Sequence, residues 1–165
     1  MRNRLTLFLF MLCFYAGSAF ADFEQNWTGA FVPWPNENVS DLPSGIAACA
    51  EGDAVRMGLM PVTCSTSGDV TVTFTYTSGE HALKILGVDM VKKNAEGVYE
   101  VAYSSYVTKS AGSAPNNVQT YTLSGVVTGD YKLRYFVCHR SSGDHSLNQT
   151  NGTISVAGLD RKSFT

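Results

Sequence analysis

Residues 70–91 read VTVTFTYTSGEHALKILGVDMV, and this stretch decides the fold class. Between residues 70 and 77, Val, Val, Phe and Tyr alternate with threonines, which is the period-two pattern of a strand with one buried face. A shift of one residue would bury the threonines, so the register of this strand should be well determined. Gly79 then supplies a turn, and Gly87 in the return segment predicts a bulge or a close backbone approach. The stretch therefore predicts a strand, a turn and a return strand.

More short strands, separated by turn residues, follow along the chain. The predicted ranges are Val98–Ser105, Gln119–Val127, Tyr131–His139 and Thr153–Ala157. No helical periodicity accompanies them, and this pattern is typical of a β-sandwich or a β-barrel. Ser, Thr, Gly, Asn and Tyr are also abundant, as in proteins built from strands and turns. We therefore expect an all-β fold.

The first residues of the chain are typical of an exported protein. Arg2 and Arg4 precede an apolar run and then small residues that end at Ala21, which together predict a signal peptide over residues 1–21. We expect the product to be secreted or held at the cell surface after cleavage near Ala21. Residues 22–67 lack strand periodicity and predict an irregular segment packed on the sandwich, residues 68–158 predict the sandwich itself, and residues 159–165 predict a tail.

Charge and hydropathy limit the partners that we expect. The formal net charge is −2, and the charged residues are scattered rather than gathered in a basic stripe, so nucleic acid is not an expected partner. After residue 21 no segment is long and apolar enough to span a membrane, so membrane insertion is not expected. The remaining length suits one domain with a substantial core.

Three cysteines follow the predicted signal peptide, and exported proteins meet an oxidising compartment in which cysteines pair. A bridge between Cys49 and Cys64 would close a short loop and stabilise the fold by about 3 kcal/mol in the chain-entropy model. A bridge between Cys64 and Cys138 is the alternative. We favour Cys49–Cys64 slightly, with the third thiol buried as a small apolar group. None of the three lies in a CxxC pair, so no metal site is predicted from them.

The sequence offers no evident catalytic set. No GxSxG nucleophile elbow appears, and His81, His139 and His145 are interpreted as turn or loop residues. The acidic residues lie mostly at turns and form no pair of the kind that glycosidases use. We therefore predict that the protein is not an enzyme.

The order of strands and turns resembles a family of binding modules. The motifs are VTFTYTSGEHALKILGVDMVKKNAEGVYEVAYSS, a polar loop that ends in Asn116 and Asn117, YTLSGVVTGDYKLRYFVC and NGTISVAG, which cover roughly Gly68 to Gly158. They are similar to the accessory β-sandwich modules, of the galactose-binding-like jelly-roll type, in exported bacterial sialidases and other carbohydrate-processing enzymes. The resemblance implies a jelly-roll fold, a carbohydrate ligand and no catalysis.

We expect no cofactor, although the resemblance to jelly rolls admits a structural calcium ion. Asp41, Asp53 and Asp144 are the acids that could contribute ligands, and no loop shows a known spacing of calcium ligands.

Sugar binding depends on aromatic rings that stack against C–H groups and on planar polar side chains that bond pairs of hydroxyls. Tyr103 and Tyr106 lie in predicted strands, so we favour half-buried packing over ligand binding for them. For Asn116 and Asn117 we favour a turn over ligand binding. The tryptophans lie in segments that are poor core strands. The candidate ligand-binding residues are Trp27, Trp34, Tyr103, Tyr106, Asn116, Asn117 and Arg134.

The sequence thus predicts a secreted, non-catalytic module that binds a glycan or glycoprotein. Two alternatives remain open. One is a structural or protein-interaction module of adhesin type that pairs through an exposed sheet edge. The other is an accessory part of a glycoside hydrolase such as a sialidase.

Overall fold

The computed structural model describes most of the chain after residue 21. The described residues are 22–27, 36–38, 42–46, 49, 54–77, 85–107, 118–139 and 151–162. Their regular elements are strands, namely β1 Asp22–Trp27, β2 Asn36–Asn38, β3 Ala54–Cys64, β4 Gly68–Thr77, β5 Ile85–Lys93, β6 Tyr99–Tyr106, β7 Val118–Val126, β8 Gly129–His139, β9 Asn151–Ala157 and β10 Asp160–Arg161. The predicted all-β fold is confirmed. In these ranges no helix is long and apolar enough to cross a membrane.

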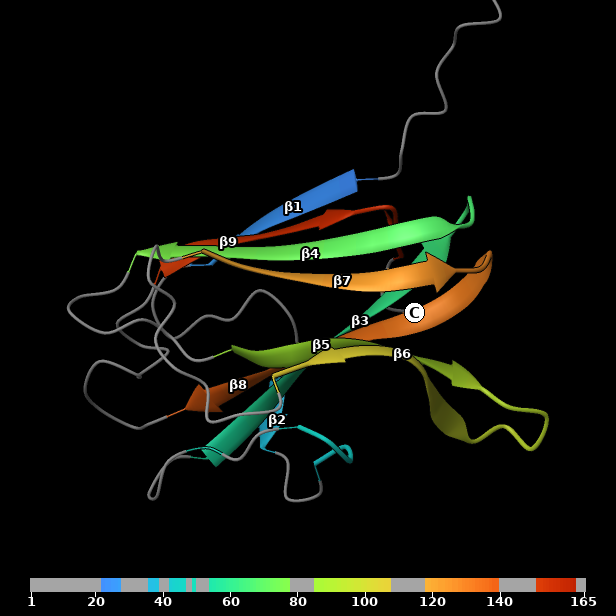
Figure 1. Cartoon of the computed structure of the whole chain (residues 1–165), viewed down its shortest axis with the longest axis horizontal. Coiled ribbons are helices and arrows are strands. Elements are labelled where there is room, and N and C mark those ends of the chain that lie inside the picture. The colour runs from blue at the N-terminus through green and yellow to red at the C-terminus, as the bar shows by residue number, and fades with distance from the viewer. Residues whose placement is uncertain are drawn as a thin grey trace, which may run out of the picture.

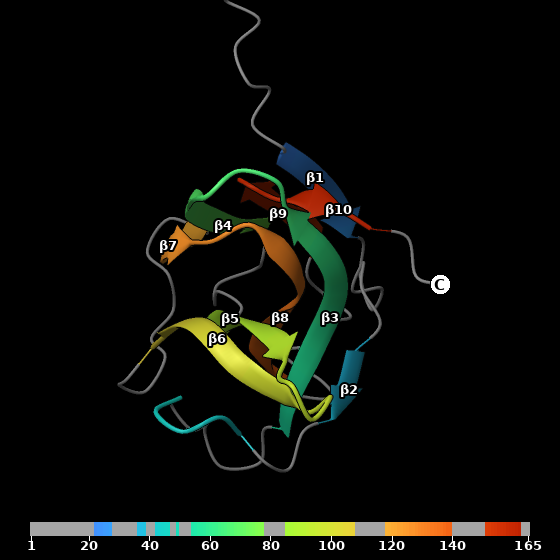
Figure 2. The same cartoon turned by 90° about the vertical axis from the view of Figure 1, so that its right-hand side faces the viewer.

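The strands form two antiparallel sheets that pack face to face (Figure 1). One sheet has the order β1-β9-β4-β7, and the other has the order β10-β3-β8-β5-β6, with β2 also paired to β3. The pair β5·β6 is enclosed in the sequence by the pair β4·β7, which is enclosed by β3·β8 and then by β1·β9. From the innermost pair outward, successive pairs lie in alternate sheets. The turned view in Figure 2 shows the two layers end on. This arrangement is a jelly roll, so the predicted β-sandwich of jelly-roll type is confirmed.

The main core lies between the two sheets, and β4 shows how the sequence builds it. The apolar residues of its alternating pattern point inward, and Val72 and Phe74 are at most 1% exposed. The ring of Phe74 packs edge-to-face on Tyr121 of β7, with 6.0 Å between the ring centroids. The threonines point to the outer face, where the Oγ1 atoms of Thr73 and Thr120 lie 3.2 Å apart. Each large apolar side chain buried in this way stabilises the fold by about 1.5–3 kcal/mol.

Residues 22–67 were expected to be irregular, but the part of this range that the structure describes contains regular strands. They supply β1, β2 and β3, and β3 is an 11-residue strand inside the six-stranded sheet. Gly58 leaves room for Tyr135 of β8, because a Cβ atom at Gly58 would lie 2.0 Å from that ring. Pro61 is tolerated in β3 because both its backbone nitrogen and its carbonyl point away from β8. The carbonyl accepts a 3.0 Å hydrogen bond from the Lys162 N–H. The short β10 likewise lies in the predicted tail and pairs with β3.

Gly87 in β5 confirms both features that its position predicts. The pairing of β5 with β8 shifts between Ile85 and Gly87, which marks an irregularity in the ladder. The φ angle of Gly87 is 139°, and a Cβ atom there would lie 2.4 Å from the carbonyl oxygen of Ser105 in β6. Only glycine fits this close approach without strain. The backbone of β6 can therefore lie tightly against β5.

A smaller apolar cluster covers part of the outer face of the six-stranded sheet. Leu86, Phe136 and Cys138 are buried there beneath the segment that contains Leu42 and Cys49. Cys49 is bonded to Cys138, with 5.6 Å between the Cα atoms, so the favoured Cys49–Cys64 pairing is wrong. Cys64 instead points into the main core as a buried free thiol, and burial raises its pKa.

Candidate functional site

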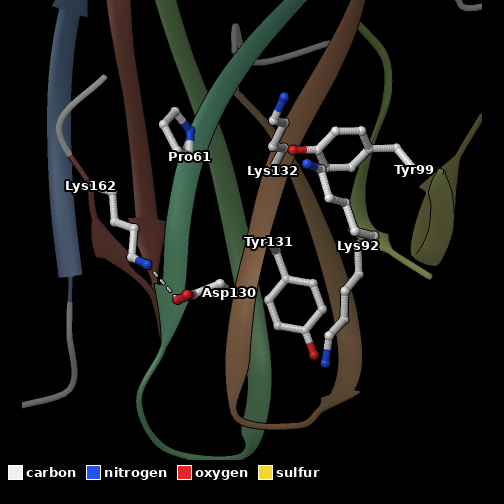
Figure 3. Close-up of a pocket in the computed structure, with 8 residues that line it drawn as sticks. Pro61, Lys92, Tyr99, Asp130, Tyr131, Lys132 and Lys162 are labelled. Carbon is white, nitrogen blue, oxygen red and sulfur yellow. Dashed lines mark ion pairs between the residues drawn. The ribbon is translucent and has the colours of Figure 1, made fainter. Parts of the chain in front are cut away.

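A pocket of about 370 Å³ lies at the end of the six-stranded sheet where β5 ends and β6 and β8 begin. Figure 3 shows Lys132 beside Tyr99 on one side of this pocket and Lys162 beside Asp130 on the other. Every lysine in the part of the chain that the structure describes lines it. The lining residues are Pro61, Lys92, Lys93, Tyr99, Asp130, Tyr131, Lys132 and Lys162. We call this feature the lysine pocket.

The register of four strands brings the outer part of the lysine pocket together. Pro61 of β3 is opposite Lys132 of β8, and Lys132 is opposite Val91 of β5. Two residues further along β5, Lys93 is opposite Tyr99 of β6. Partners directly opposite each other in an antiparallel pair project to the same face. Residues from distant parts of the sequence therefore share the outer face of one sheet.

Tyr99 is the exposed aromatic surface of the lysine pocket. Its side chain is 43% exposed, although it lies in a strand where aromatic rings are commonly half-buried. The Nζ atom of Lys132 lies 4.1 Å from its ring centroid, and the Nζ atom of Lys93 lies 5.4 Å from it. Each of these cation–π contacts is worth about 0.5–1 kcal/mol at an exposed site. The two ammonium groups are therefore held near the ring with N–H donors left for another partner.

Lys162 and Asp130 form an ion pair on the other side of the lysine pocket. Lys162 Nζ lies 2.6 Å from Asp130 Oδ1, and the Thr63 hydroxyl donates a 2.8 Å hydrogen bond to the same oxygen. The hydrogen bond from Lys162, and to a smaller extent the one from Thr63, holds the pKa of Asp130 below its ordinary value. Asp130 therefore remains ionised at neutral pH and compensates the charge of Lys162.

Tyr131 forms the floor next to these residues. Its hydroxyl donates a 3.0 Å hydrogen bond to the carbonyl of Val127, and Lys92 Nζ lies 5.4 Å from its ring centroid. Burial, with a smaller effect of the neighbouring Tyr103, raises the pKa of Tyr131 to about 12. The phenol is therefore neutral at physiological pH.

The lysine pocket carries an excess of positive charge. Asp130 is the one carboxylate among its lining residues, and it pairs with Lys162. Within the described ranges, no carboxylate lies within ion-pair distance of Lys92, Lys93 or Lys132. Three ammonium groups thus lie outside ion-pair distance of any described carboxylate, in a protein whose formal net charge is −2.

Two of the predicted ligand-binding residues meet at a buried carboxylate instead of at an open surface. Arg134 Nε and Nη2 each donate a 2.7 Å hydrogen bond to Asp89, and the Tyr106 hydroxyl donates to Asp89 Oδ2. Asp89 is 0% exposed. Burial and the contact with Asp89 raise the pKa of Tyr106. This arrangement engages Tyr106 and two nitrogens of Arg134 in structural contacts.

Tyr103 also packs in the way that its strand position predicts. Its ring meets that of Tyr131 at a centroid distance of 6.0 Å, and its hydroxyl accepts a 3.2 Å hydrogen bond from the Val127 N–H. It therefore supports Tyr131 beneath the lysine pocket and does not line it. The half-buried packing favoured for both tyrosines agrees with their surroundings, and their ligand-binding role stays a prediction.

Of the other predicted ligand-binding residues, the structure describes the backbone of Trp27 alone. Trp27 ends β1 in the four-stranded sheet, where its backbone pairs with Gly152. Trp34, Asn116 and Asn117 lie outside the described residues, as do the candidate calcium ligands Asp41, Asp53 and Asp144. Among the residues that the structure does describe, no group of three or more His, Cys, Asp or Glu side chains could hold a metal ion.

The lysine pocket itself was not predicted from the sequence. Its one local signal is the Lys92–Lys93 pair followed four residues later by the hairpin turn at Gly97, which is an ordinary sequence for a strand end. The register of β8 between β3 and β5 is needed to add Lys132 and Pro61. The C-terminal ends of β6 and β8 lie at the opposite end of the sheet from the lysine pocket.

Comparisons with known proteins assign no family to the chain. No protein-family model matches it, and no curated protein matches it. One solved chain that does match is described as "Structural basis for the promiscuous specificity of the carbohydrate-binding modules from the beta-sandwich super family", with a TM-score of 0.41 and 12% sequence identity. The match covers 91% of this chain and 60% of that chain. Similarity this low assigns no ligand, and it shows no link to sialidases.

Proposed function

We propose that this protein is an exported, non-catalytic module that binds carbohydrate and that the lysine pocket is its binding site. The observation that carries the proposal is the Tyr99 ring, which is 43% exposed in a pocket bounded by amine donors. A volume of about 370 Å³ lies within the usual range of small-ligand sites, roughly 300–1,000 Å³.

The chemistry of the lining suits a sugar. An exposed aromatic ring offers an apolar surface for the C–H groups of a pyranose, and lysine ammonium groups donate hydrogen bonds to its oxygens. Pro61 adds a second apolar surface on β3, opposite Lys132 of β8. Binding is favoured over hydrolysis because glycosidases use two carboxyl groups, whereas the lining contains Asp130 alone and Asp130 is paired with Lys162.

A binding titration against a panel of neutral and acidic polysaccharides tests the proposal. Wild-type protein should bind at least one polysaccharide saturably, and Tyr99→Ala should weaken that binding about ten-fold or more. Tyr99→Phe keeps the ring and should retain most of the affinity. Val118→Ala changes another exposed side chain outside the lysine pocket and serves as the matched control. Equal binding by wild type and Tyr99→Ala, or no binding to any member of the panel, would refute the proposal.

A second candidate function rests on the edge strand β6. β6 is the last strand of the six-stranded sheet, and Val98 just before it and Val101 within it are 58% and 47% exposed. Exposed edges with apolar side chains can pair with another chain. Light scattering over a range of protein concentrations would detect such pairing, and a monomer at every concentration would dismiss self-association through this edge.

A further inference from the structure

We propose that the carbohydrate bound in the lysine pocket is acidic, with its carboxylate or sulfate ester held by Lys132 and Lys93 beside Tyr99. This inference rests on the proposed function of the same site and specifies the class of sugar. A carboxylate and a sulfate ester share the chemistry that matters here, since both present anionic oxygens to ammonium groups.

The first argument is the local balance of charge. Four lysines line the lysine pocket, and one carboxylate, Asp130, compensates Lys162. The ammonium groups of Lys92, Lys93 and Lys132 are gathered at one end of a sheet without a described carboxylate in ion-pair range. Like charges held close together repel one another, and an anionic ligand would relieve that repulsion. A neutral sugar would leave it in place.

The second argument is the position of these charges relative to the aromatic ring. Lys132 and Lys93 hold their Nζ atoms 4.1 Å and 5.4 Å from the centroid of Tyr99. A sugar in contact with the ring would therefore place an acidic substituent within reach of both ammonium groups. The same ligand could pack its C–H groups against Tyr99 and pair its anion with the lysines. An acidic carbohydrate supplies both of these groups in one molecule.

The third argument separates an acidic sugar from a general polyanion. Among the described residues, the lysines are gathered in this pocket and do not extend as a stripe, which nucleic acid binding normally requires. Of the three described arginines, Arg134 is paired with the buried Asp89, and Arg161 and Arg56 are opposite Val62 and Val137, whose side chains point into the core. Arg161 therefore lies on the other face of the sheet from Pro61 and Lys132.

The experiment compares acidic polysaccharides with neutral counterparts by isothermal titration. Polygalacturonate is paired with its methyl ester, and dextran sulfate is paired with dextran. Polyglutamate serves as an acidic polymer that is not a carbohydrate. We expect at least one acidic polysaccharide to bind about ten-fold more tightly than its neutral counterpart and than polyglutamate. Whether polygalacturonate or dextran sulfate binds more tightly shows whether the anion is a carboxylate or a sulfate ester.

Variants locate the effect within the lysine pocket. Lys132→Gln and Lys93→Gln should each weaken binding of the acidic polysaccharide several-fold, and Lys132→Arg should retain most of it because the charge remains. Arg161→Gln removes the same charge from a residue that does not line the lysine pocket and should bind like wild type. Thermal denaturation of each variant confirms that it is folded.

The outcomes distinguish this inference from the proposed function. Equal affinity for a neutral polysaccharide and its acidic counterpart would overturn the inference and leave carbohydrate binding intact. Equal affinity for polyglutamate and the acidic polysaccharides would also overturn it, because the lysine pocket would then select acidic polymers in general. Binding to none of the five polymers would overturn the inference and count against the proposed function as well.

Discussion

Lys132 on β8 holds its Nζ atom 4.1 Å from the centroid of the Tyr99 ring on β6, although β5 separates the two strands. The contact spans the middle strand because Lys132 is opposite Val91, and Lys93 two residues later is opposite Tyr99. A charged group and an exposed ring are thereby fixed on one face by three strands of the sheet. Sites built on strands are positioned more rigidly than sites on loops.

Asp130→Asn should strengthen the binding of an acidic polysaccharide. The substitution removes the carboxylate of the lysine pocket and leaves Lys162 without its partner, so the positive charge available to an anion increases. Affinity for dextran sulfate at neutral pH should rise several-fold, as measured by titration. Unchanged or weaker binding would show that Lys162 and Asp130 lie outside the ligand's reach.

The same ion pair has a defined pH dependence. The pKa of Asp130 is lowered, so its contribution to folding stability is present above the pKa of an unfolded aspartate and is lost as pH falls through the folded pKa. The difference in dextran sulfate affinity between wild type and Asp130→Asn should therefore persist at mildly acidic pH. This difference in affinity should disappear only when the pH falls below the ordinary range of an aspartate pKa.

Arg134→Ala should act on stability and not on ligand affinity. Removing this side chain leaves the buried carboxylate of Asp89 without its bidentate partner, and breaking a buried pair in this way costs about 3–5 kcal/mol. Urea denaturation measures the loss. Asp89→Asn should also be destabilising, and the double variant should lose less stability than the two single losses added together. A fully stable Arg134→Ala that no longer binds sugar would restore Arg134 as a ligand-binding residue.

Cys64 should be the one free thiol among the cysteines that follow residue 21. It is 1% exposed, and burial raises its pKa, so a thiol reagent at neutral pH should modify none of the folded protein and one group per molecule after denaturation. Peptide mapping should find Cys49 joined to Cys138. Reducing this bridge should destabilise the fold by about 4–5 kcal/mol in the chain-entropy model, because the closed loop is long. A map with Cys49 joined to Cys64 would contradict the structure.

Gly58→Ala should lower the free energy of unfolding by about 1–3 kcal/mol through overpacking, because the added methyl group would lie 2.0 Å from the Tyr135 ring. Tyr135→Leu in the same chain should recover part of the loss by vacating that space. Gly68→Ala is the matched control, since a Cβ atom there meets nothing within 4 Å, and its effect should stay within about 0.5 kcal/mol. Equal losses at the two glycines would argue against the close packing of β3 on β8.

The sequence predicts the strands from β4 to β9 because their alternation is local, but it does not predict their partners, since β4 and the return strand β5 lie in different sheets. β4 alternates apolar residues with threonines, and the predicted strand ranges agree with β6 to β9 within one or two residues. β3 escapes prediction because apolar residues occupy both of its faces and because Gly58 and Pro61 are ordinarily poor strand residues. Both are explained only by long-range partners, namely the Tyr135 ring and the short edge strand β10.

The candidate site is harder to predict than the fold for the same reason. Tyr99 and Lys132 are unremarkable in the sequence, and their meeting depends on the register of β5 against both β6 and β8. Arg134 and Tyr106 were reasonable candidates by residue type, but the buried Asp89 that engages them is recognised only once its burial is known. The disulfide also depends on the fold. A short loop favours pairing of Cys49 with Cys64, whereas β8 places Cys138 on the outer face of the sheet next to Cys49.

Mapping the ligand contacts by NMR tests the central claim most directly. An acidic oligosaccharide is added to isotope-labelled protein, and the shifts of backbone amides and lysine side chains are followed. We predict that the largest changes fall on Lys93, Tyr99 and Lys132 at the end of the six-stranded sheet where β6 and β8 begin. Changes that instead gather at the opposite end of the sheet, or around Trp27 on β1, would contradict the lysine pocket as the binding site.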